Sequence, residues 1–406
     1  MKIKFLLEKG LICMMILAGF NFLPQFRLIG IPYFQLLIVF CILIGLFFLK
    51  IKTDYAIAEI KYYSWYLLAS IPAFLIGLLL EIENSFLVYL YALFPYLLFI
   101  ATIDIIDKYL YHKLLGILLI SMVLITTIGW LLRLVIIPVD TFFDVIDSEF
   151  DIGYWGLRYT DSTRNNDYLY PLIGLPISMY FYVLKKYKIL NIVLIFFFIL
   201  TLISSLSRAA LIISCLSIVQ LIRLSTTQLR AGVIVVLFLV VSFNFNLIMN
   251  EYDAKYNLII NSIFKLKDTD NKFSNEARLI IIEDALESSI TNPFGYGLCN
   301  YSSIYEGNYR ENISNSSENA YLTILVERGW LAFIFFINFL YYSFKTSVKS
   351  DEINLNKFLI PFLLIYLLFN YELNNVFGNF IFYLVFLSSF FMNEALKSNQ
   401  VYEQNK

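Results

Sequence analysis

The stretch KILNIVLIFFFILTLISSLSRAALIISCLSIVQLI, residues 188–222, sets the architecture of the chain. It contains two apolar runs, 188–204 and 208–222, that are separated only by a short serine-rich turn. A helix that crosses the hydrocarbon core of a bilayer needs about 17–25 mostly apolar residues. The pattern therefore predicts two consecutive membrane-spanning helices, with Arg208 at the boundary where the second one begins.

The rest of the chain repeats this apolar pattern. Its 406 residues are 60% hydrophobic and 15% charged, with a mean hydropathy of +0.73, whereas soluble domains carry about 25% charged residues. The sequence predicts an all-α integral membrane protein of about 12 transmembrane helices, with two large extracytoplasmic loops, the second containing short helices. The expected spans are 5–23, 28–49, 62–80, 85–103, 114–137, 168–184, 188–204, 208–222, 229–249, 319–344, 357–370 and 376–393.

The distribution of lysine and arginine sets the expected orientation. With the N-terminus inside, the short inner loops hold most of the basic residues, as the positive-inside bias requires. Both termini are then cytoplasmic. The chain divides into N-terminal transmembrane helices at 1–137, an extracytoplasmic loop at 138–167, central transmembrane helices at 168–249, a large extracytoplasmic loop at 250–318, and C-terminal transmembrane helices with a cytoplasmic tail at 319–406.

Net charge and reactive residues exclude several classes of protein. The net charge is −1, so no basic field points to nucleic acid, and we expect no nucleic-acid partner. The four cysteines indicate neither a disulfide nor a metal framework, and we expect no metal and no cofactor. The single histidine, His112, falls on the inner side. This excludes any mechanism that needs two histidines.

The second large loop contains a predicted helix followed by a tight turn. Ser274 or Asn275 can cap a helix that Asn292-Pro293 ends. An apolar stripe recurs in it at three- and four-residue spacing: Leu279, Ile282, Leu286 and Ile290. The helix either packs on the bundle or lies at the membrane interface. The glycines of Pro293-Phe294-Gly295-Tyr296-Gly297 predict a tight turn and allow the backbone to approach a ligand closely.

Two arginines near this loop allow two interpretations each. Arg208 either extends to lipid headgroups or binds phosphate oxygens, for which its fork of donors is suited. Arg278 either lies on a solvated helix face beside Glu283 or Asp284, or forms a second phosphate clamp.

Glu318 and Asn319 stand where the chain re-enters the membrane. They are either plain helix caps, or Glu318 is a base that deprotonates a hydroxyl group. Downstream, Glu327 and Arg328 indicate either that the span begins near Gly329 or that the pair lies between helices. Ionisable residues at membrane depth are functional candidates, and a mutually neutralising pair is the alternative.

The first large loop, 138–167, combines carboxylates, arginines and aromatic residues. Asp167, Arg158 and Arg164 accompany Tyr154 and Trp155 there. Aromatic rings stack on sugar faces and carboxylates accept hydrogen bonds from hydroxyl groups, so the loop suits sugar binding. The same residues also suit an aromatic belt at the membrane interface.

Three segments, in this order, resemble the O-antigen polymerase and O-antigen ligase superfamily: Ser207-Arg208-Ala209; Arg278 to Asn300 with the 293–297 turn; and Glu318-Asn319-Ala320-Tyr321-Leu322 through Glu327-Arg328-Gly329. The similar part covers roughly 190–345. The resemblance implies a polytopic glycosyltransferase of the bacterial cytoplasmic (inner) membrane. It would act at the extracytoplasmic face on undecaprenyl-pyrophosphate-linked glycans, without nucleotide sugar or metal.

The resemblance also implies roles for individual residues. The expected catalytic residues are Glu318, Arg208 and Arg278, and the expected substrate-binding residues are Arg158, Arg164, Asp167, Gly295, Gly297, Arg310, Asn319 and Tyr321. Glu318 stands where ligases carry a histidine before the asparagine, and a carboxylate base there is more like the polymerases. Asp167 and Glu311 are further candidates for the base. The Arg-x(10)-Gly pattern of polymerase loops is not cleanly present.

We therefore expect a polymerase that joins lipid-linked repeat units into O-antigen, capsular or exopolysaccharide. Its partners are an undecaprenyl-pyrophosphate-linked oligosaccharide as donor and as acceptor, membrane lipid and a chain-length regulator. A ligase of the same superfamily is one alternative. A lipid-linked oligosaccharide flippase or other transporter is another, although charge is sparse at the midplane and no internal repeat is evident.

Overall fold

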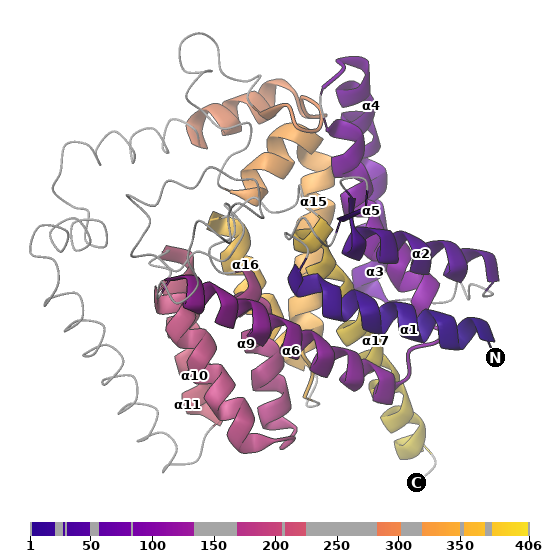
Figure 1. The fold of residues 1–406 in the computed structure, drawn as a ribbon. Helices are drawn as coiled ribbons and strands as arrows, with labels where there is room; N and C mark the ends of the chain where they lie inside the picture. Colours follow the sequence, from indigo (N-terminus) through magenta and orange to yellow (C-terminus); the bar gives the residue numbers. More distant parts are fainter. Residues whose placement is uncertain are drawn as a thin grey trace, which may run out of the picture.

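The protein is a bundle of helices in the computed structural model (Figure 1). The structure describes residues 2–20, 27–28, 31–48, 57–82, 84–133, 169–204, 208–224, 282–301, 319–349, 353–369 and 376–404. The strand pairing within these residues is one short antiparallel contact between β1 (Arg27–Leu28) and β2 (Ile31–Pro32). The expectation of an all-α fold is therefore confirmed for the described part of the chain.

The helices follow the apolar runs of the sequence. Those of the first half are α1 (Lys2–Leu17), η1 (Ala18–Phe20), α2 (Tyr33–Phe48), α3 (Ala58–Ala69), α4 (Ile71–Leu79), α5 (Ser85–Thr102) and α6 (Lys108–Arg133). The remaining ones are α9 (Leu169–Val183), α10 (Lys188–Ser204), α11 (Arg208–Leu224), α15 (Ala320–Lys349), α16 (Asn356–Phe369) and α17 (Val376–Gln404). Helical residues 282–291 lie between α11 and α15 in the chain. The expected span 229–249 lies outside the described residues.

Four helical segments of the described chain are long and apolar enough to cross a membrane: Ala58–Leu79, Ser85–Thr102, Lys108–Leu131 and Ala320–Val348. Shorter apolar helices accompany them, among them α9 and α16. The structure thus supports a membrane protein, while the total of about 12 spans and the layout of the loops stay predictions.

The first of these segments is broken where an unbroken span was expected. Ser70 separates α3 from α4, and its hydroxyl group donates to the carbonyl oxygen of Tyr66 at 2.8 Å. Pro72 stands in the first turn of α4, where its missing N–H costs little because that turn has no acceptor for it. A serine that bonds back to the preceding turn and a proline that starts the next one account for the break.

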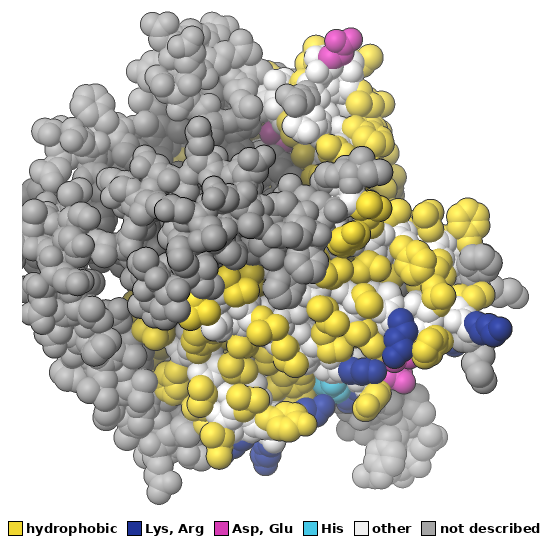
Figure 2. All heavy atoms as spheres, in the orientation of Figure 1, with side chains coloured by type: hydrophobic (Ala, Val, Ile, Leu, Met, Phe, Trp, Pro, Cys, Tyr) yellow, Lys and Arg dark blue, Asp and Glu magenta, His cyan; other side chains and the backbone are white. Residues whose placement is uncertain are grey.

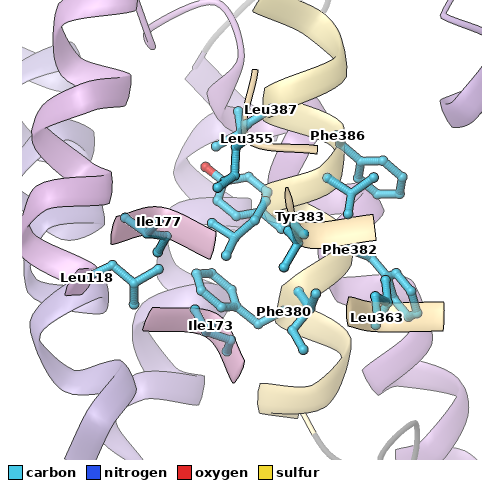
Figure 3. Close-up of a cluster of buried hydrophobic side chains, with 14 of the residues drawn as sticks. Leu118, Ile173, Ile177, Leu355, Leu363, Phe380, Phe382, Tyr383, Phe386 and Leu387 are labelled. Carbon is cyan, nitrogen blue, oxygen red and sulfur yellow. The ribbon is translucent and has the colours of Figure 1, made fainter. Parts of the chain in front are cut away.

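The core of the bundle surrounds α17. Residues 378–389 of this helix are buried on every side, as expected for a helix inside a bundle. Figure 3 shows Phe380 and Tyr383 of α17 among Ile173 and Ile177 of α9, and Leu363 of α16 on another side. The hydroxyl group of Tyr383 lies 3.0 Å from that of Thr102 at the end of α5. This dense packing fixes the helices that carry the candidate site.

Charge distinguishes the two ends of the bundle. On the face in Figure 2, lysine and arginine side chains gather in the lower part, beside the histidine and one acidic group, whereas the charged side chains near the top are acidic. The ion pair Lys113–Glu8, at 3.3 Å, joins α6 to α1 in the basic region. We call this the lysine-bearing end, and the opposite end, which carries the α4–α5 connection at 80–84, the 80–84 end.

Candidate functional site: a turn locked into a broken helix

Helix α15 is interrupted at Gly329, close to the 80–84 end. Gly329 has φ 81° and ψ 174°, which no helical residue adopts, and the helix changes direction there in Figure 1. A break of this kind leaves carbonyl oxygens before it and N–H groups after it without partners inside the helix. Because unpaired backbone groups are costly at membrane depth, they require partners from another segment.

The segment 292–301, which follows helical residues 282–291 and which we call the locked turn, supplies these partners. The N–H of Tyr296 donates to the carbonyl oxygen of Val326 at 2.9 Å, and that of Gly297 donates to the carbonyl oxygen of Glu327 at 3.2 Å. In return, the N–H of Trp330 donates to the carbonyl oxygen of Pro293 at 3.0 Å. Groups on both sides of the break are thus bonded to a single short turn.

Two glycines permit this close approach. Gly295 and Gly329 both have positive φ, 87° and 81°. A Cβ atom on Gly295 would lie 2.3 Å from the carbonyl oxygen of Glu327, and one on Gly329 would lie 2.4 Å from that of Pro293. The prediction of a tight glycine turn is confirmed. The close approach that the structure shows is to the backbone of α15, while the role of Gly295 and Gly297 in binding substrate stays a prediction.

The other side of the turn is fixed to the α4–α5 hairpin. The N–H of Leu298 donates to the carbonyl oxygen of Ala73 at 3.2 Å, and the hydroxyl group of Ser85 donates to the carbonyl oxygen of Leu298 at 2.9 Å. Leu298 and Tyr301 are fully buried. The turn is therefore held between two membrane-spanning elements, a constraint that no local sequence pattern signals.

The charged pair at the break is buried. Glu327 and Arg328 are 0% and 2% exposed. The guanidinium carbon of Arg328 lies 5.2 Å from the centre of the Tyr66 ring, and an Nη1 hydrogen points to the hydroxyl oxygen of Ser70 at 3.5 Å. A desolvated cation over an aromatic face is worth about 2 kcal/mol. Arg328 thereby joins the break in α15 to the break between α3 and α4.

Glu327 and Arg328 end the first helical part of α15 and directly precede the break at Gly329. The structure thus confirms a helix boundary next to the pair, while the choice between a functional and a mutually neutralising pair stays a prediction. No local sequence pattern indicates that Tyr66 and Ser70 are neighbours of this pair. The one signal in the sequence is the occurrence of Ser70 and Pro72 inside an apolar run.

The thiol of Cys299 lies in the electrostatic environment of Glu327 and Arg328. Burial raises the pKa of its thiol to about 12, the carboxylate of Glu327 adds to the increase, and the guanidinium of Arg328 opposes it. A thiol with this pKa stays protonated near neutral pH and is a poor nucleophile. Burial therefore disfavours the thiolate form of Cys299.

Residues 319–321 begin α15 at the 80–84 end. The side-chain oxygen of Asn319 accepts hydrogen bonds from the N–H groups of Tyr321 at 2.9 Å and Leu322 at 3.3 Å. This is an N-cap, as one of the two interpretations proposed. The hydroxyl group of Tyr321 donates to the carbonyl oxygen of Leu364 in α16 at 3.3 Å. Their predicted contacts with substrate stay predictions.

The structure does not describe most of the other predicted site residues. Arg208 is placed as the first residue of α11, as its position at a span boundary suggested. The following lie outside the described residues: Arg158, Arg164, Asp167, Arg278, Arg310, Glu311 and Glu318. Whether these residues meet in one cavity therefore stays a prediction.

His112 is placed away from the turn. Its Nε2 atom lies 3.0 Å from the hydroxyl oxygen of Tyr180. The lysine side chains of Lys108 and Lys186 face the same imidazole. These contacts put it at the lysine-bearing end, and its location on the inner side of the membrane stays a prediction.

One face of the helix at 282–291 is buried against the bundle and another is exposed. Ala285 and Ser289 are fully buried, whereas Ile282, Leu286 and Ile290 are 39%, 44% and 73% exposed. The apolar stripe identified in the sequence therefore does not pack on the bundle. Leu279 and Arg278 precede the described part of this helix.

A comparison with known protein families gives a match to the region that contains the three motif segments. Residues 193–337 match the family model described as O-antigen ligase, which confirms the resemblance to the O-antigen ligase and polymerase superfamily for this part of the chain. The matched region contains Arg208, the 293–297 turn, Asn319 and Gly329. Members of this family are glycosyltransferase-like enzymes of bacterial membranes. No curated protein matches the chain.

Proposed function

We propose that this protein is a polymerase that joins undecaprenyl-pyrophosphate-linked oligosaccharide repeat units into O-antigen, capsular polysaccharide or exopolysaccharide. The observation that carries this proposal is the family match over 193–337, the region in which the three motif segments occur in order. The residue before Asn319 favours a polymerase over a ligase, because it is a glutamate in this chain and a histidine in the ligases that the chain resembles.

The proposed reaction transfers a glycan from one lipid carrier to another. A hydroxyl oxygen of the acceptor sugar attacks the anomeric carbon of the donor's reducing-end sugar, and the bond from that carbon to the phosphate oxygen breaks. The hydroxyl proton passes to the carboxylate of Glu318, the proposed base. The electron pair of the broken bond leaves with undecaprenyl pyrophosphate, so negative charge grows on the phosphates.

Arginine side chains are proposed to stabilise this growing negative charge. Arg208 and Arg278 would hold the pyrophosphate oxygens, and pre-placed cations of this kind favour the transition state over the ground state. Orientation of two large lipid-linked substrates would supply much of the remaining acceleration. The proposed helpers and sugar-binding residues are Arg158, Arg164, Asp167 and Arg310, with Asn319 and Tyr321.

The locked turn gives this proposal a structural basis. Glu318 directly precedes Asn319, the N-cap of α15. The first helical part of α15 ends at the break that the 292–301 segment holds by hydrogen bonds to Val326, Glu327 and Trp330. We infer that this segment serves to keep the start of α15 at a fixed place, because a base must stay within hydrogen-bond reach of the acceptor hydroxyl.

We also propose that the 80–84 end is extracytoplasmic. Lysine and arginine gather at the opposite end (Figure 2), and basic residues favour the cytoplasmic side of a membrane. In this orientation both termini are cytoplasmic, and the start of α15 faces the outside of the cytoplasmic membrane. Undecaprenyl-pyrophosphate-linked oligosaccharides are the partners on that side, together with a chain-length regulator.

Purified protein in detergent tests the proposed function. Incubation with undecaprenyl-pyrophosphate-linked repeat units should yield a ladder of longer lipid-linked glycans. No sealed compartment is present, so transport alone cannot produce this result. A protein that leaves the units unchanged, but moves finished polymer to a second acceptor, would be a ligase instead.

The glycan phenotype of a deletion strain gives a second test in cells. Loss of a polymerase leaves single repeat units attached to their final acceptor. Loss of a ligase leaves polymer on the lipid carrier, which would overturn the choice between the two activities.

A further inference from the structure

The locked turn lies below the end of the membrane span to which it is bonded. Ala58–Leu79 is a 22-residue segment that is long and apolar enough to cross a membrane, and its second part, α4, ends at the 80–84 end. Leu298 bonds to the carbonyl oxygen of Ala73. The six residues from Ala73 to Leu79 correspond to about 9 Å. The Leu298 end of the turn is thus set about 9 Å inside the 80–84 end of this span, and Gly297, which lies against Gly77, about 3 Å inside it.

The helix at 282–291 is attached to the bundle at this level. The indole N–H of Trp330, the residue after the break in α15, donates to the carbonyl oxygen of Ser289 at 3.0 Å. Ala285 and Ser289 form the buried side of the helix. The helix and the turn together are therefore one fixed unit, whose depth follows from the spans that hold it.

The surface of this helix has three sectors. At about 100° per residue, Ala285 and Ser289 fall on one side, against the protein. Leu286 and Ile290 fall on the adjacent side and are exposed. Glu287 is exposed, and it falls on the side opposite the buried residues. A helix with a protein-facing, an apolar and an acidic sector has the pattern of one that lies in a membrane interface.

The apolar sector extends beyond the helix. Phe294, one turn after Ile290, is 69% exposed in the locked turn. Trp330 is 38% exposed, and below it the outward side of α15 continues with exposed Leu331 and Ile334. Because Trp330 is bonded to the helix, the apolar surface of the helix adjoins the apolar outer face of a membrane span. We call Ile282, Leu286, Ile290 and Phe294 the apolar row.

We propose that residues 282–294 lie in the bilayer leaflet at the 80–84 end, with the apolar row against lipid acyl chains. Three features select lipid as the occupant: the depth set by Ala73, the continuity of the row with the exposed face of α15, and the acidic sector, which faces headgroups and water. The turn tolerates this depth because its N–H groups are bonded to α15 and α4. The proposal does not depend on the reaction catalysed.

Spin labels on single cysteines test the proposal in lipid bilayers. In a background with Cys13, Cys41, Cys215 and Cys299 replaced by serine, the variants Leu286→Cys, Ile290→Cys and Phe294→Cys probe the apolar row. Glu287→Cys, opposite the buried side, is the matched control on the same helix. Each variant is purified, checked for a single symmetric elution peak, and reconstituted into phosphatidylethanolamine and phosphatidylglycerol vesicles. Collision with oxygen, which concentrates in the hydrocarbon, is then compared with collision with a water-soluble nickel chelate.

The expected result is an oxygen-to-chelate accessibility ratio several-fold higher at positions 286, 290 and 294 than at 287. Two results would overturn the proposal. Equal access of the chelate to the row and to position 287 would place the row in water. Exclusion of both reagents from 286, 290 and 294 would show that protein, such as a second copy of the chain, covers the row.

Discussion

Gly295 and Gly329 face each other across the contact between the locked turn and the broken helix α15. A Cβ atom on the first would lie 2.3 Å from the carbonyl oxygen of Glu327, and one on the second would lie 2.4 Å from that of Pro293. Such distances leave no room for a methyl group on either side. Both positions therefore require glycine, because the backbone next to each glycine occupies the space that a side chain on the other would need.

We predict that Gly295→Ala and Gly329→Ala destabilise the protein and shorten or abolish polymer. Positive φ in a non-glycine residue costs about 1–3 kcal/mol, and the backbone overlap adds to this cost. Gly116→Ala is the matched control, because a Cβ there would meet nothing within 4 Å. Thermal unfolding in detergent and glycan gels measure both effects. An unfolding temperature for Gly295→Ala equal to that of Gly116→Ala would contradict the interlock.

The position of the helices was predictable from sequence, and the interlock was not. Apolar runs such as 188–204 and 376–393 predict helices because a bilayer admits few other structures. The partners of Gly295 and Gly329 come from segments far apart in the chain, so no local pattern indicates their contact. Ser70 and Pro72 sit in an apolar run whose composition predicts an unbroken span, and their effect becomes clear only in the structure.

We predict that Arg328→Met costs roughly 3–5 kcal/mol, the range for removal of one member of a buried charged network. Arg328→Lys should restore part of the loss, because it keeps the charge but not the planar group over Tyr66. Tyr66→Phe should stay close to wild type and Tyr66→Leu should not, since only the ring faces the cation. Arg223→Met, at an exposed position in the last turn of α11, is the control. Equal unfolding temperatures for Arg328→Met and Arg223→Met would exclude this role for Arg328.

Cys299 should resist alkylation in the folded protein. Because burial raises the pKa of this thiol to about 12, the thiolate fraction near pH 7.5 is very small, and the rate of reaction with N-ethylmaleimide should be low and should rise as the pH goes from neutral to mildly alkaline. The same cysteine in denatured protein is the control, and mass spectrometry of peptides measures both rates. Labelling of Cys299 at neutral pH as fast in the folded as in the denatured protein would show that the thiol is not buried beside Glu327.

The raised pKa of Cys299 also predicts how the stability of the folded protein changes with pH. The pKa of Cys299 is raised in the folded state above its ordinary value of 9.0. Below pH 9 the thiol is protonated in both states and contributes no pH dependence. Between pH 9 and about 12 the unfolded chain releases this proton and the folded protein does not, so stability should fall as pH rises. Cys299→Ala should reduce that fall, as measured by unfolding temperature against pH.

The proposed chemistry makes the sharpest prediction at Arg208, Arg278 and Glu318. Arg208→Ala and Arg278→Ala should abolish long polymer while the protein stays in the membrane, because the departing pyrophosphate loses its cations. Glu318→Gln should do the same by removing the base, without a change of size. Arg223→Ala is the matched control, since Arg223 stands near the other end of the helix that Arg208 begins. Wild-type chain lengths in either arginine variant, with normal protein levels in the membrane, would rule out the pyrophosphate clamp.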